Sequence, residues 1–273
     1  MNFGEKTVLI TGGSSGIGLE LAKLFAYDGY QLVLIAKPLE ELENAKKILH
    51  EINPKIHILL KTHDLTQLEA AQEIYEFTQN YGLKINVLVN CAGFGSYGFV
   101  NEIDMDKELS MLQLHVSTLY HLTRLYLRDM VEHDDGYIIN MSSMTAFQPT
   151  PKMAVYGASK SFVLQFSRAL NYELHELNSK VRVMAVCPTS VKDTKFQEEA
   201  DMENTKTFNF WMTTTADVVA CDTYRAMQQG HDMVVPGRGF GLLQTLISRL
   251  PTNWLMKISR IHLQEKEIKK KVR

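Results

Sequence analysis

The chain has 273 residues, of which 45% are hydrophobic and 22% are charged, ordinary proportions for a globular protein with a sizeable core. This composition excludes disordered, collagen-like and coiled-coil chains, and a net charge of −2 provides no basic field for nucleic acid. Because there is no signal-peptide pattern, no run of 18 apolar residues and no metal-ligand spacing among Cys91, Cys187 and Cys221, we expect a cytoplasmic protein with free thiols.

Short apolar runs alternate with segments of helical periodicity along the chain. The runs predict strands at residues 7–11, 31–36, 56–61, 85–90, 137–141, 181–186 and 233–235. Apolar spacings of three and four predict helices at residues 19–25, 39–52, 68–78, 111–130, 155–177 and 218–227. This alternation indicates an α/β fold, a Rossmann-like doubly wound parallel sheet of seven strands with helices on both faces. We expect one domain over residues 1–236 and an amphipathic helical extension over residues 237–273.

A glycine-rich turn follows the first predicted strand, with the sequence Gly12-Gly13-Ser14-Ser15-Gly16-Ile17-Gly18. Glycine allows positive φ angles and close approach of a ligand to the backbone. The N-terminus of the helix that follows offers free N–H groups and a positive dipole end, which suit a diphosphate. The spacing differs from the common G-x-G-x-x-G fingerprint, and a turn that needs glycine for steric reasons alone is the alternative.

A tyrosine and a lysine, Tyr156 and Lys160, lie one turn apart at the start of a predicted helix. Positions i and i+4 share a helix face, and a neighbouring cation lowers the pKa of a phenol toward the range useful for proton transfer. Ser143 follows the strand at 137–141, at the sheet edge where ligands bind in such folds, and Ser142 competes for the same role. For the tyrosine and lysine alone, an ordinary helix pair is the alternative.

In chain order, these motifs resemble those of the short-chain dehydrogenase/reductase family over almost the whole chain. Residues 11–18 resemble its T-G-x-x-x-G-I-G loop, residues 90–93 its N-N-A-G motif, and Asp64 the acid that holds adenine. Ser143, Tyr156 and Lys160 match its serine and Y-x-x-x-K motif. The resemblance implies hydride transfer between a nicotinamide cofactor and a ketone or aldehyde, in either direction. Ser143 would bind the carbonyl, Tyr156 would act as the general acid/base, and Lys160 would hold the ribose and tune Tyr156.

The resemblance also implies the residues that bind the cofactor, and a homodimer or homotetramer. The cofactor residues are Gly12, Ser14, Ser15, Gly16, Ile17, Gly18, Lys37, Asp64, Leu65, Asn90, Ala92, Gly93, Tyr156, Lys160, Pro188, Val191 and Thr194. The second predicted strand ends in Ala36-Lys37 without an acid that would repel a 2′-phosphate, and Lys37 supplies a cation. We therefore expect NADP(H) to be preferred over NAD(H), although Lys37 as a solvated loop lysine is the alternative.

Two positions depart from the family pattern. His115 stands where the family commonly has an asparagine that supports a water in the proton relay, and imidazole offers both a donor and an acceptor. It would join the catalytic set, and a buried structural histidine is the alternative. Pro188-Thr189 replaces a P-G pair and lengthens the path to Thr194, which puts a contact between Thr194 and the nicotinamide carboxamide in question.

Aromatic and methionine side chains gather where a substrate would bind, and they predict an apolar ketone or aldehyde. Phe94, Met144, Phe147 and Met153 are the candidate substrate residues, with further aromatics at Tyr97, Phe196, Phe208, Phe210 and Trp211. The segment before Thr213 is expected to form a lid over the site. Core packing is the alternative for this cluster.

The extension carries apolar residues at helical spacing, namely Leu242, Leu243, Leu246, Ile247, Leu250, Trp254, Leu255, Ile258 and Ile261. From Lys257 to Arg273 there are seven Lys or Arg and two Glu. We expect this face to pack on the protein itself or on a second subunit, and contact with an anionic membrane is the alternative. Two other functions remain open, a dinucleotide-binding sensor or scaffold with little turnover, and a lipid carbonyl reductase at a membrane surface.

Overall fold

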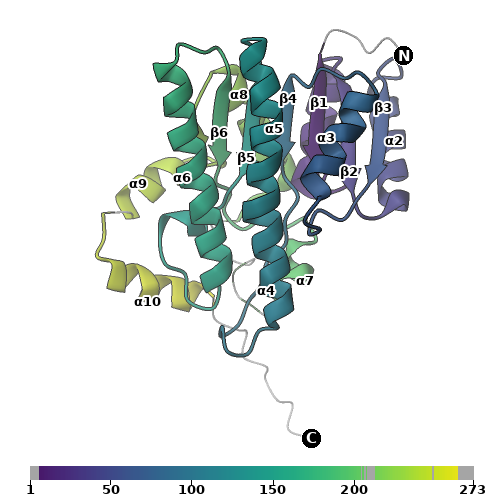
Figure 1. The fold of residues 1–273 in the computed structure, drawn as a ribbon. Coiled ribbons are helices and arrows are strands. Elements are labelled where there is room, and N and C mark those ends of the chain that lie inside the picture. The colour runs from purple at the N-terminus through teal and green to yellow at the C-terminus, as the bar shows by residue number, and fades with distance from the viewer. Residues whose placement is uncertain (1–5, 204, 206, 208–212, 248, 264–273) are drawn as a thin grey trace, which may run out of the picture.

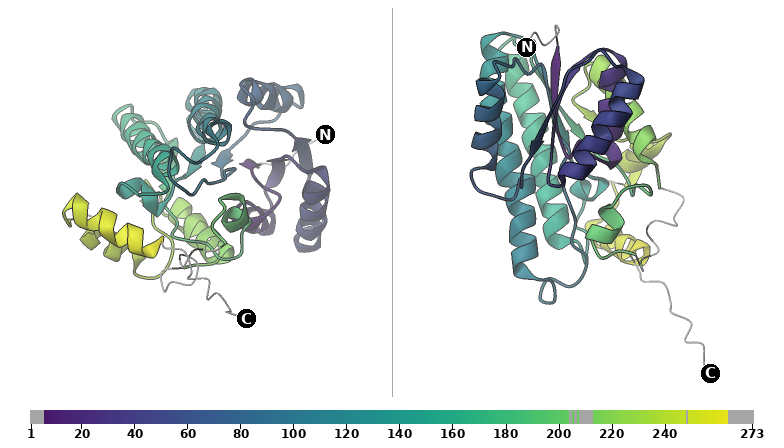
Figure 2. Two further views of the ribbon diagram at one scale, coloured as in Figure 1. Left: turned by 90° about the horizontal axis from the view of Figure 1, so that it is seen from below. Right: turned by 90° about the vertical axis from the view of Figure 1, so that its right-hand side faces the viewer.

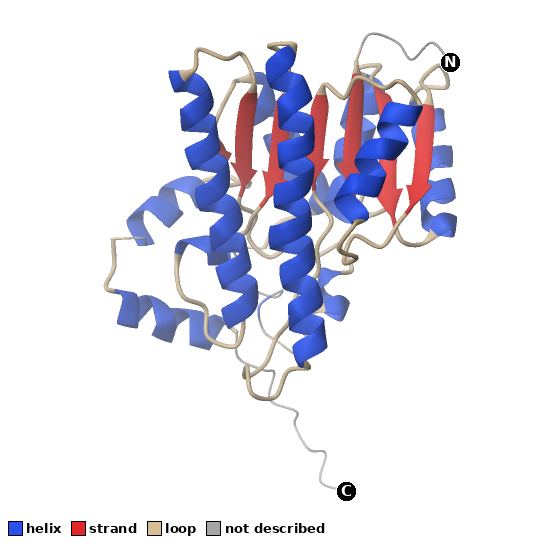
Figure 3. Cartoon of the chain, viewed as in Figure 1, coloured by secondary structure: helices blue, strands red, loops and turns tan. Residues whose placement is uncertain are grey.

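The computed structural model describes residues 6–203, 205, 207, 213–247 and 249–263, and a parallel sheet of seven strands lies at its centre (Figure 3). The strand order is β3-β2-β1-β4-β5-β6-β7, which confirms the predicted doubly wound sheet. The strands are β1 (Thr7–Thr11), β2 (Gln31–Ala36), β3 (Ile58–Thr62), β4 (Val87–Asn90), β5 (Tyr137–Met141), β6 (Arg182–Val186) and β7 (Met233–Val234). The register pairs Val8 of β1 with Leu32 and with Val87, so the strand ends align at one edge.

Helices cover both faces of the sheet (Figures 1 and 2). One layer consists of α1 (Gly16–Tyr27), α2 (Leu39–Ile52) and α8 (Ala216–Gln228). The other consists of α3 (Ala70–Asn80), α4 (Met105–Leu112), α5 (Leu119–Glu132) and α6 (Ala154–Glu176). Strand side chains alternate between the layers, so that Val8 and Ile10 face α1 while Leu9 packs under α5. Because both faces of the sheet are covered, the central strands are rich in buried apolar residues.

Several boundaries differ from those predicted. Helix α1 begins at Gly16, three residues earlier than expected, because glycines carry no apolar signal. Strands β3 and β4 begin two residues later than predicted. The predicted helix at 111–130 starts at Met105 and contains a π-helical segment at Gln113–Thr118 between α4 and α5. Such π segments often mark functional positions, and this one holds His115.

Four short elements lie beyond the carboxyl ends of the strands (Figure 1). They are η2 (Met144–Phe147), α7 (Phe196–Glu199), α9 (Phe240–Ile247) and α10 (Thr252–His262). The leucine face of the extension does not pack on this chain in α9, where Leu242 and Leu246 are exposed and Gln244 is buried, and its packing on a second subunit stays a prediction. Among the residues placed by the structure, no helix is long and apolar enough to cross a bilayer.

Candidate active site

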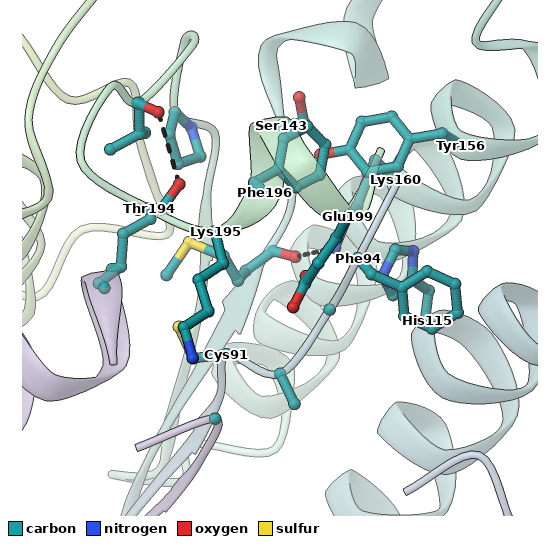
Figure 4. Close-up of a pocket in the computed structure, with 18 of the residues that line it drawn as sticks. Cys91, Phe94, His115, Ser143, Tyr156, Lys160, Thr194, Lys195, Phe196 and Glu199 are labelled. Carbon is teal, nitrogen blue, oxygen red and sulfur yellow. Dashed lines mark hydrogen bonds between the residues drawn. The ribbon is translucent and has the colours of Figure 1, made fainter. Parts of the chain in front are cut away.

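A cavity of about 990 Å³ lies at the carboxyl edge of the sheet. It runs from the glycine turn after β1, past the ends of β4 and β5, to α6 and the C-terminal helix α10. Ligands bind at this edge in open α/β sheets, because the strand order reverses there between β1 and β4. Figure 4 shows Ser143, Tyr156 and Phe196 on one side of the cavity and His115 beside them.

The glycine turn forms a tight wall of the cavity. Gly12 and Gly16 have φ angles of +67° and +51°, in the region that favours glycine. A Cβ atom on Gly18 would lie 2.1 Å from the carbonyl oxygen of Gly12, so no other residue fits there without moving the backbone. Gly12, Ser14, Ser15, Gly16, Ile17 and Gly18 all line the cavity. The turn therefore presents the start of α1 to the cavity, as expected for a diphosphate site.

Polar side chains fix the strand ends below this turn. The Thr11 hydroxyl accepts hydrogen bonds from the backbone N–H groups of Cys91 and Ala92, at 3.0 and 3.1 Å. Asn90 donates to Asn140 at 2.8 Å and is buried. Asn90 therefore joins β4 to β5 and is absent from the cavity lining, whereas Ala92 and Gly93 line it; its contact with the cofactor stays a prediction.

An ion pair closes the cavity end near β2. Lys37 Nζ lies 2.9 Å from Asp64 Oδ2, and the backbone N–H and hydroxyl of Thr66 donate to the other carboxylate oxygen. Burial disfavours the charged form, but these partners outweigh it and lower the pKa of Asp64 to about 2. Lys37 is thus paired, although its side chain is still 61% exposed. Ala36 and Leu65 line the same end of the cavity.

Ser143, Tyr156 and Lys160 come together in the cavity as predicted. Ser143 caps η2 by accepting a hydrogen bond from the Thr145 N–H at 3.2 Å, and it hydrogen-bonds the Tyr156 phenol. Lys160 Nζ donates to the carbonyl oxygen of Met141 at 3.0 Å. The hydroxyl of Ser142 donates to the Lys160 carbonyl at 2.8 Å. Ser142 is thus held within the structure, which leaves Ser143 as the serine next to the phenol.

The expectation that Lys160 lowers the pKa of Tyr156 is wrong for this state. Burial raises the pKa of Tyr156 to about 12, and the hydrogen bond with Ser143 only moderates that rise. The Lys160 ammonium lies 5.7 Å from the centre of the phenol ring and donates a hydrogen bond to the carbonyl oxygen of Met141. Burial also lowers the pKa of Lys160 to about 8, against the effect of the Cys91 and Cys187 thiols. The phenol is therefore protonated at neutral pH.

His115 is buried against Tyr156, with ring centres 5.9 Å apart. Its Nδ1 lies 3.0 Å from the Ser159 hydroxyl, which donates its one proton to the Tyr156 carbonyl at 2.7 Å. Ser159 must then accept from His115, which places the imidazole proton on Nδ1. Burial, together with the Lys160 charge, holds the pKa of His115 well below its usual value, so Nε2 is an unprotonated acceptor.

The acceptor atom of His115 faces a small space inside the cavity. Nε2 has no hydrogen-bond partner among the described residues. A Cβ atom on Gly93 would lie 2.7 Å from Nε2 and 3.5 Å from Lys160 Nζ, so the lack of a side chain at Gly93 keeps this space open. Two further buried hydroxyls that line the cavity, those of Thr145 and Thr189, are likewise unpartnered within the described part of the chain. Such groups are suited to a polar ligand.

Three of the four predicted substrate residues lie in the cavity lining. Phe94, Met144 and Met153 line the cavity. Phe147 does not, because it packs against a buried cluster that includes Leu164 and Cys187. Phe208, Phe210 and Trp211 lie outside the described residues. Pro188, Val191 and Thr194 line the cavity, but Thr194 packs beside Gly16, 3.1 Å from where a Cβ atom on that glycine would lie.

Several cavity residues were not anticipated from the sequence. Lys195 forms an ion pair with Glu41, which also accepts a hydrogen bond from Ser14 at 3.3 Å. Glu199 of α7 faces the cavity (Figure 4), and burial raises the pKa of its carboxyl group. The C-terminal helix contributes Leu255, Ser259, Ile261 and Leu263. No motif marks these residues, because their positions depend on how distant segments pack.

The residues present fit a nicotinamide dinucleotide. The glycine turn, the Asp64 end and the Tyr156 end lie along one cavity, and unpartnered polar atoms stand near the Tyr156 end. Because Gly18 packs directly against Gly12, the N-terminus of α1 can face a bound diphosphate.

Comparisons with known proteins agree with this arrangement. The family described as short chain dehydrogenase matches residues 6–205. An uncharacterised oxidoreductase of Staphylococcus saprophyticus is 27% identical over 83% of this chain and 93% of its own length. The very-long-chain 3-oxoacyl-CoA reductase of Anas platyrhynchos is 34% identical over 60% of this chain, and the match spans 54% of that reductase.

Solved structures share the fold. A short-chain dehydrogenase from Sphingobium yanoikuyae in complex with NADPH is 25% identical, with a TM-score of 0.78 over 90% of this chain and 97% of the other. A short-chain dehydrogenase/reductase from Burkholderia phymatum in complex with NAD is 20% identical, with a TM-score of 0.77 over 90% and 94% of the two chains.

Proposed function

The chain is a member of the short-chain dehydrogenase/reductase family, and we propose that it is an NADP(H)-dependent oxidoreductase that reduces an apolar ketone or aldehyde, or oxidises the corresponding alcohol. The observation that carries the proposal is the meeting of Ser143, Tyr156 and Lys160 in one cavity with the glycine turn. The cofactor, when bound, supplies or accepts the hydride. All other steps fall to the side chains of this protein.

In the direction of reduction, Tyr156 is the proton donor. Its raised pKa keeps the phenol protonated at neutral pH, and its hydrogen bond with Ser143 fixes where the hydroxyl points. A carbonyl oxygen placed between Ser143 and Tyr156 accepts hydrogen bonds from both. The phenol then gives its proton to the oxygen as negative charge develops there. Lys160, held by the Met141 carbonyl, keeps a positive charge near the phenolate that remains.

We infer that His115 serves the relay that restores the proton of Tyr156. Its unprotonated Nε2 faces the same small space as the Lys160 ammonium. A water in this space would donate to Nε2 and accept from Lys160. Because the hydrogen bond to Ser159 fixes the tautomer, His115 can support this water where the family commonly has an asparagine.

The preference for NADP(H) rests on the end of β2. Ala36 leaves no carboxylate to repel a 2′-phosphate, and the exposed Lys37 can turn from Asp64 toward one. The NADPH complex of the Sphingobium relative supports this choice, while the NAD complex of the Burkholderia protein shows that the fold accepts either cofactor. A Lys37→Gln variant should raise the KM for NADPH at least about tenfold and leave the KM for NADH unchanged. Equal changes in both values would contradict the assignment.

The apolar lining supports a bulky or long-chain carbonyl substrate. Phe94, Met144 and Met153 contribute aromatic and thioether surface, and Phe196 packs 5.3 Å from the Tyr156 ring. The likeness to a very-long-chain 3-oxoacyl-CoA reductase points in the same direction. Assembly into a homodimer or homotetramer remains a prediction.

The direct test is a carbonyl panel assayed with NADPH and with NADH. The panel would contain long-chain and diaryl ketones, a long-chain aldehyde and a short polar ketone, and the loss of reduced nicotinamide absorbance would be followed. We expect turnover of the apolar carbonyls, with NADPH preferred. Tight NADPH binding without turnover of any carbonyl would favour the sensor or scaffold instead.

A further inference from the structure

The two C-terminal helices carry exposed apolar side chains. Leu242 and Leu246 of α9 are 71% and 54% exposed, and Trp254 and Ile261 of α10 are 62% and 64% exposed. Single exposed apolar residues are common on proteins, but here they repeat at helical spacing on consecutive helices. Both helices stand at the periphery of the molecule (Figures 1 and 2).

The charged side chains of the segment that holds these helices are all positive. Residues 233–264 contain four Lys or Arg and no Asp or Glu. All four cations are exposed, and two of them, Arg249 and Lys257, follow the exposed Leu246 and Trp254 by three positions. We call this surface the C-terminal outer face; it comprises Arg238, Leu242, Leu246, Arg249, Leu250, Trp254, Lys257, Arg260 and Ile261.

The inner side of α10 is already occupied by the protein itself. Leu255, Ser259 and Leu263 are buried, Gln148 donates to Ser259 at 3.0 Å, and the Tyr97 hydroxyl donates to the Leu263 carbonyl at 2.6 Å. The helix is therefore anchored by one side. Its apolar and basic outer residues stay exposed among the described residues.

We propose that the C-terminal outer face docks on the surface of an anionic phospholipid bilayer, with α9 and α10 lying in the headgroup region. An anionic bilayer surface binds helices in which cations border exposed apolar residues. Helices of 8 and 11 residues are too short to span a bilayer, so the contact is peripheral. A second copy of this chain fits less well, because a two-fold contact would set four cations against four cations without an acid between them.

The docking surface continues into the cavity. Ile261 is an outer residue that also lines the cavity, and Ile247 of α9 lines it too. Docking would place this side of the cavity at the lipid surface, where an apolar carbonyl compound dissolved in the bilayer could enter. This last consequence rests on the proposed reductase function, whereas membrane docking does not.

The test is flotation of the full-length protein with phosphatidylcholine vesicles, with and without phosphatidylserine. We expect binding to the anionic vesicles, weakened by salt because exposed charges are screened. A Leu246→Glu/Trp254→Glu variant should lose at least about tenfold in partitioning, and a Lys257→Gln/Arg260→Gln variant about fivefold per charge removed. Matched controls at exposed positions elsewhere, Tyr27→Glu/Leu68→Glu and Lys47→Gln/Lys55→Gln, should bind as the unmodified protein does.

NADPH binding measured on every variant confirms that it is folded, independently of turnover. Absence of binding to anionic vesicles, or equal binding by the Leu246→Glu/Trp254→Glu variant, would overturn the proposal. Self-association that this variant abolishes, without vesicle binding, would assign the face to a second copy instead. Loss of binding only when residues 264–273 are removed would assign it to the basic tail.

Discussion

The two ends of the cavity are built in different ways. At the glycine end, backbone atoms pack directly against each other, and a Cβ atom on Gly18 would clash with the carbonyl oxygen of Gly12. At the other end, side-chain hydrogen bonds join residues far apart in the sequence, such as Tyr97 and Leu263. Close packing of backbone atoms permits few residue types and therefore leaves a recognisable sequence motif. Hydrogen bonds between side chains far apart in the sequence can be made by many different sequences. The glycine end is therefore predictable, and the substrate end is specific to this chain.

The largest expected effect lies where the two ends meet, at Tyr156. A Tyr156→Phe variant removes the proton donor but keeps the ring that packs on Phe196. We expect the rate of carbonyl reduction to fall about 10²–10⁴-fold, with NADPH affinity and thermal stability little changed. Steady-state kinetics and NADPH titration of the same preparation check this. A variant with normal turnover would show that another group supplies the proton.

The same substitution in the glycine turn and in α9 compares a closely packed glycine with an open one. Gly18→Ala would force a Cβ atom against the Gly12 carbonyl, so we expect the free energy of unfolding to fall by about 2–3 kcal/mol and NADPH binding to weaken. Gly241→Ala in α9 places its Cβ atom 3.9 Å from Val235, an ordinary contact, and should leave stability unchanged or raise it by up to about 1 kcal/mol. Denaturant unfolding measures both. Equal losses would remove the distinction between the two ends.

A smaller effect is expected from the titration of His115. Its pKa is well below 6.5 in the folded protein, so the unfolded chain gains a proton below pH 6.5 that the folded protein does not. Stability should therefore fall as the pH is lowered, and this one group accounts for about 1.4 kcal/mol between pH 7.5 and 5.5. A His115→Asn variant should lose that part of the slope and keep most of its activity. An unchanged slope would show that His115 is protonated in the folded state.

The smallest effect is expected at the substrate end. Tyr97→Phe removes the bond to the Leu263 carbonyl, a net contribution of about 1 kcal/mol. We expect the KM for an apolar carbonyl to rise about threefold while NADPH affinity is unchanged. Tyr75→Phe, which removes a hydrogen bond to Asp129 outside the cavity, is the matched control. It should change neither the KM for the carbonyl nor the affinity for NADPH. A loss of NADPH affinity in Tyr97→Phe would mean that the two ends are not independent.

The parallel sheet and most of the cofactor end could be predicted from the sequence. Buried strands between amphipathic helices specify the sheet, and glycines at a strand end specify the turn. The motif shows where Asn90 lies along the chain but not which way its side chain turns, and in the structure this side chain donates a hydrogen bond to Asn140.

The substrate end could not be predicted in the same detail. Phe147 and Met144 belong to the same short helix, yet only Met144 reaches the cavity. The inward residues of α10 are fixed by partners 111 and 166 positions away, which no local pattern reveals. The rise in the pKa of Tyr156 depends in the same way on packing, since it comes from burial of the phenol, which no local pattern reveals.

The most direct test of hydride transfer from NADPH follows the hydride itself. NADPH deuterated on the transferable position would be incubated with the protein and an apolar ketone that it turns over. We expect one deuterium on the carbinol carbon of the alcohol product, and no alcohol from the Tyr156→Phe variant at comparable times. Alcohol without deuterium, or NADPH that binds while no carbonyl in the panel is reduced, would contradict it.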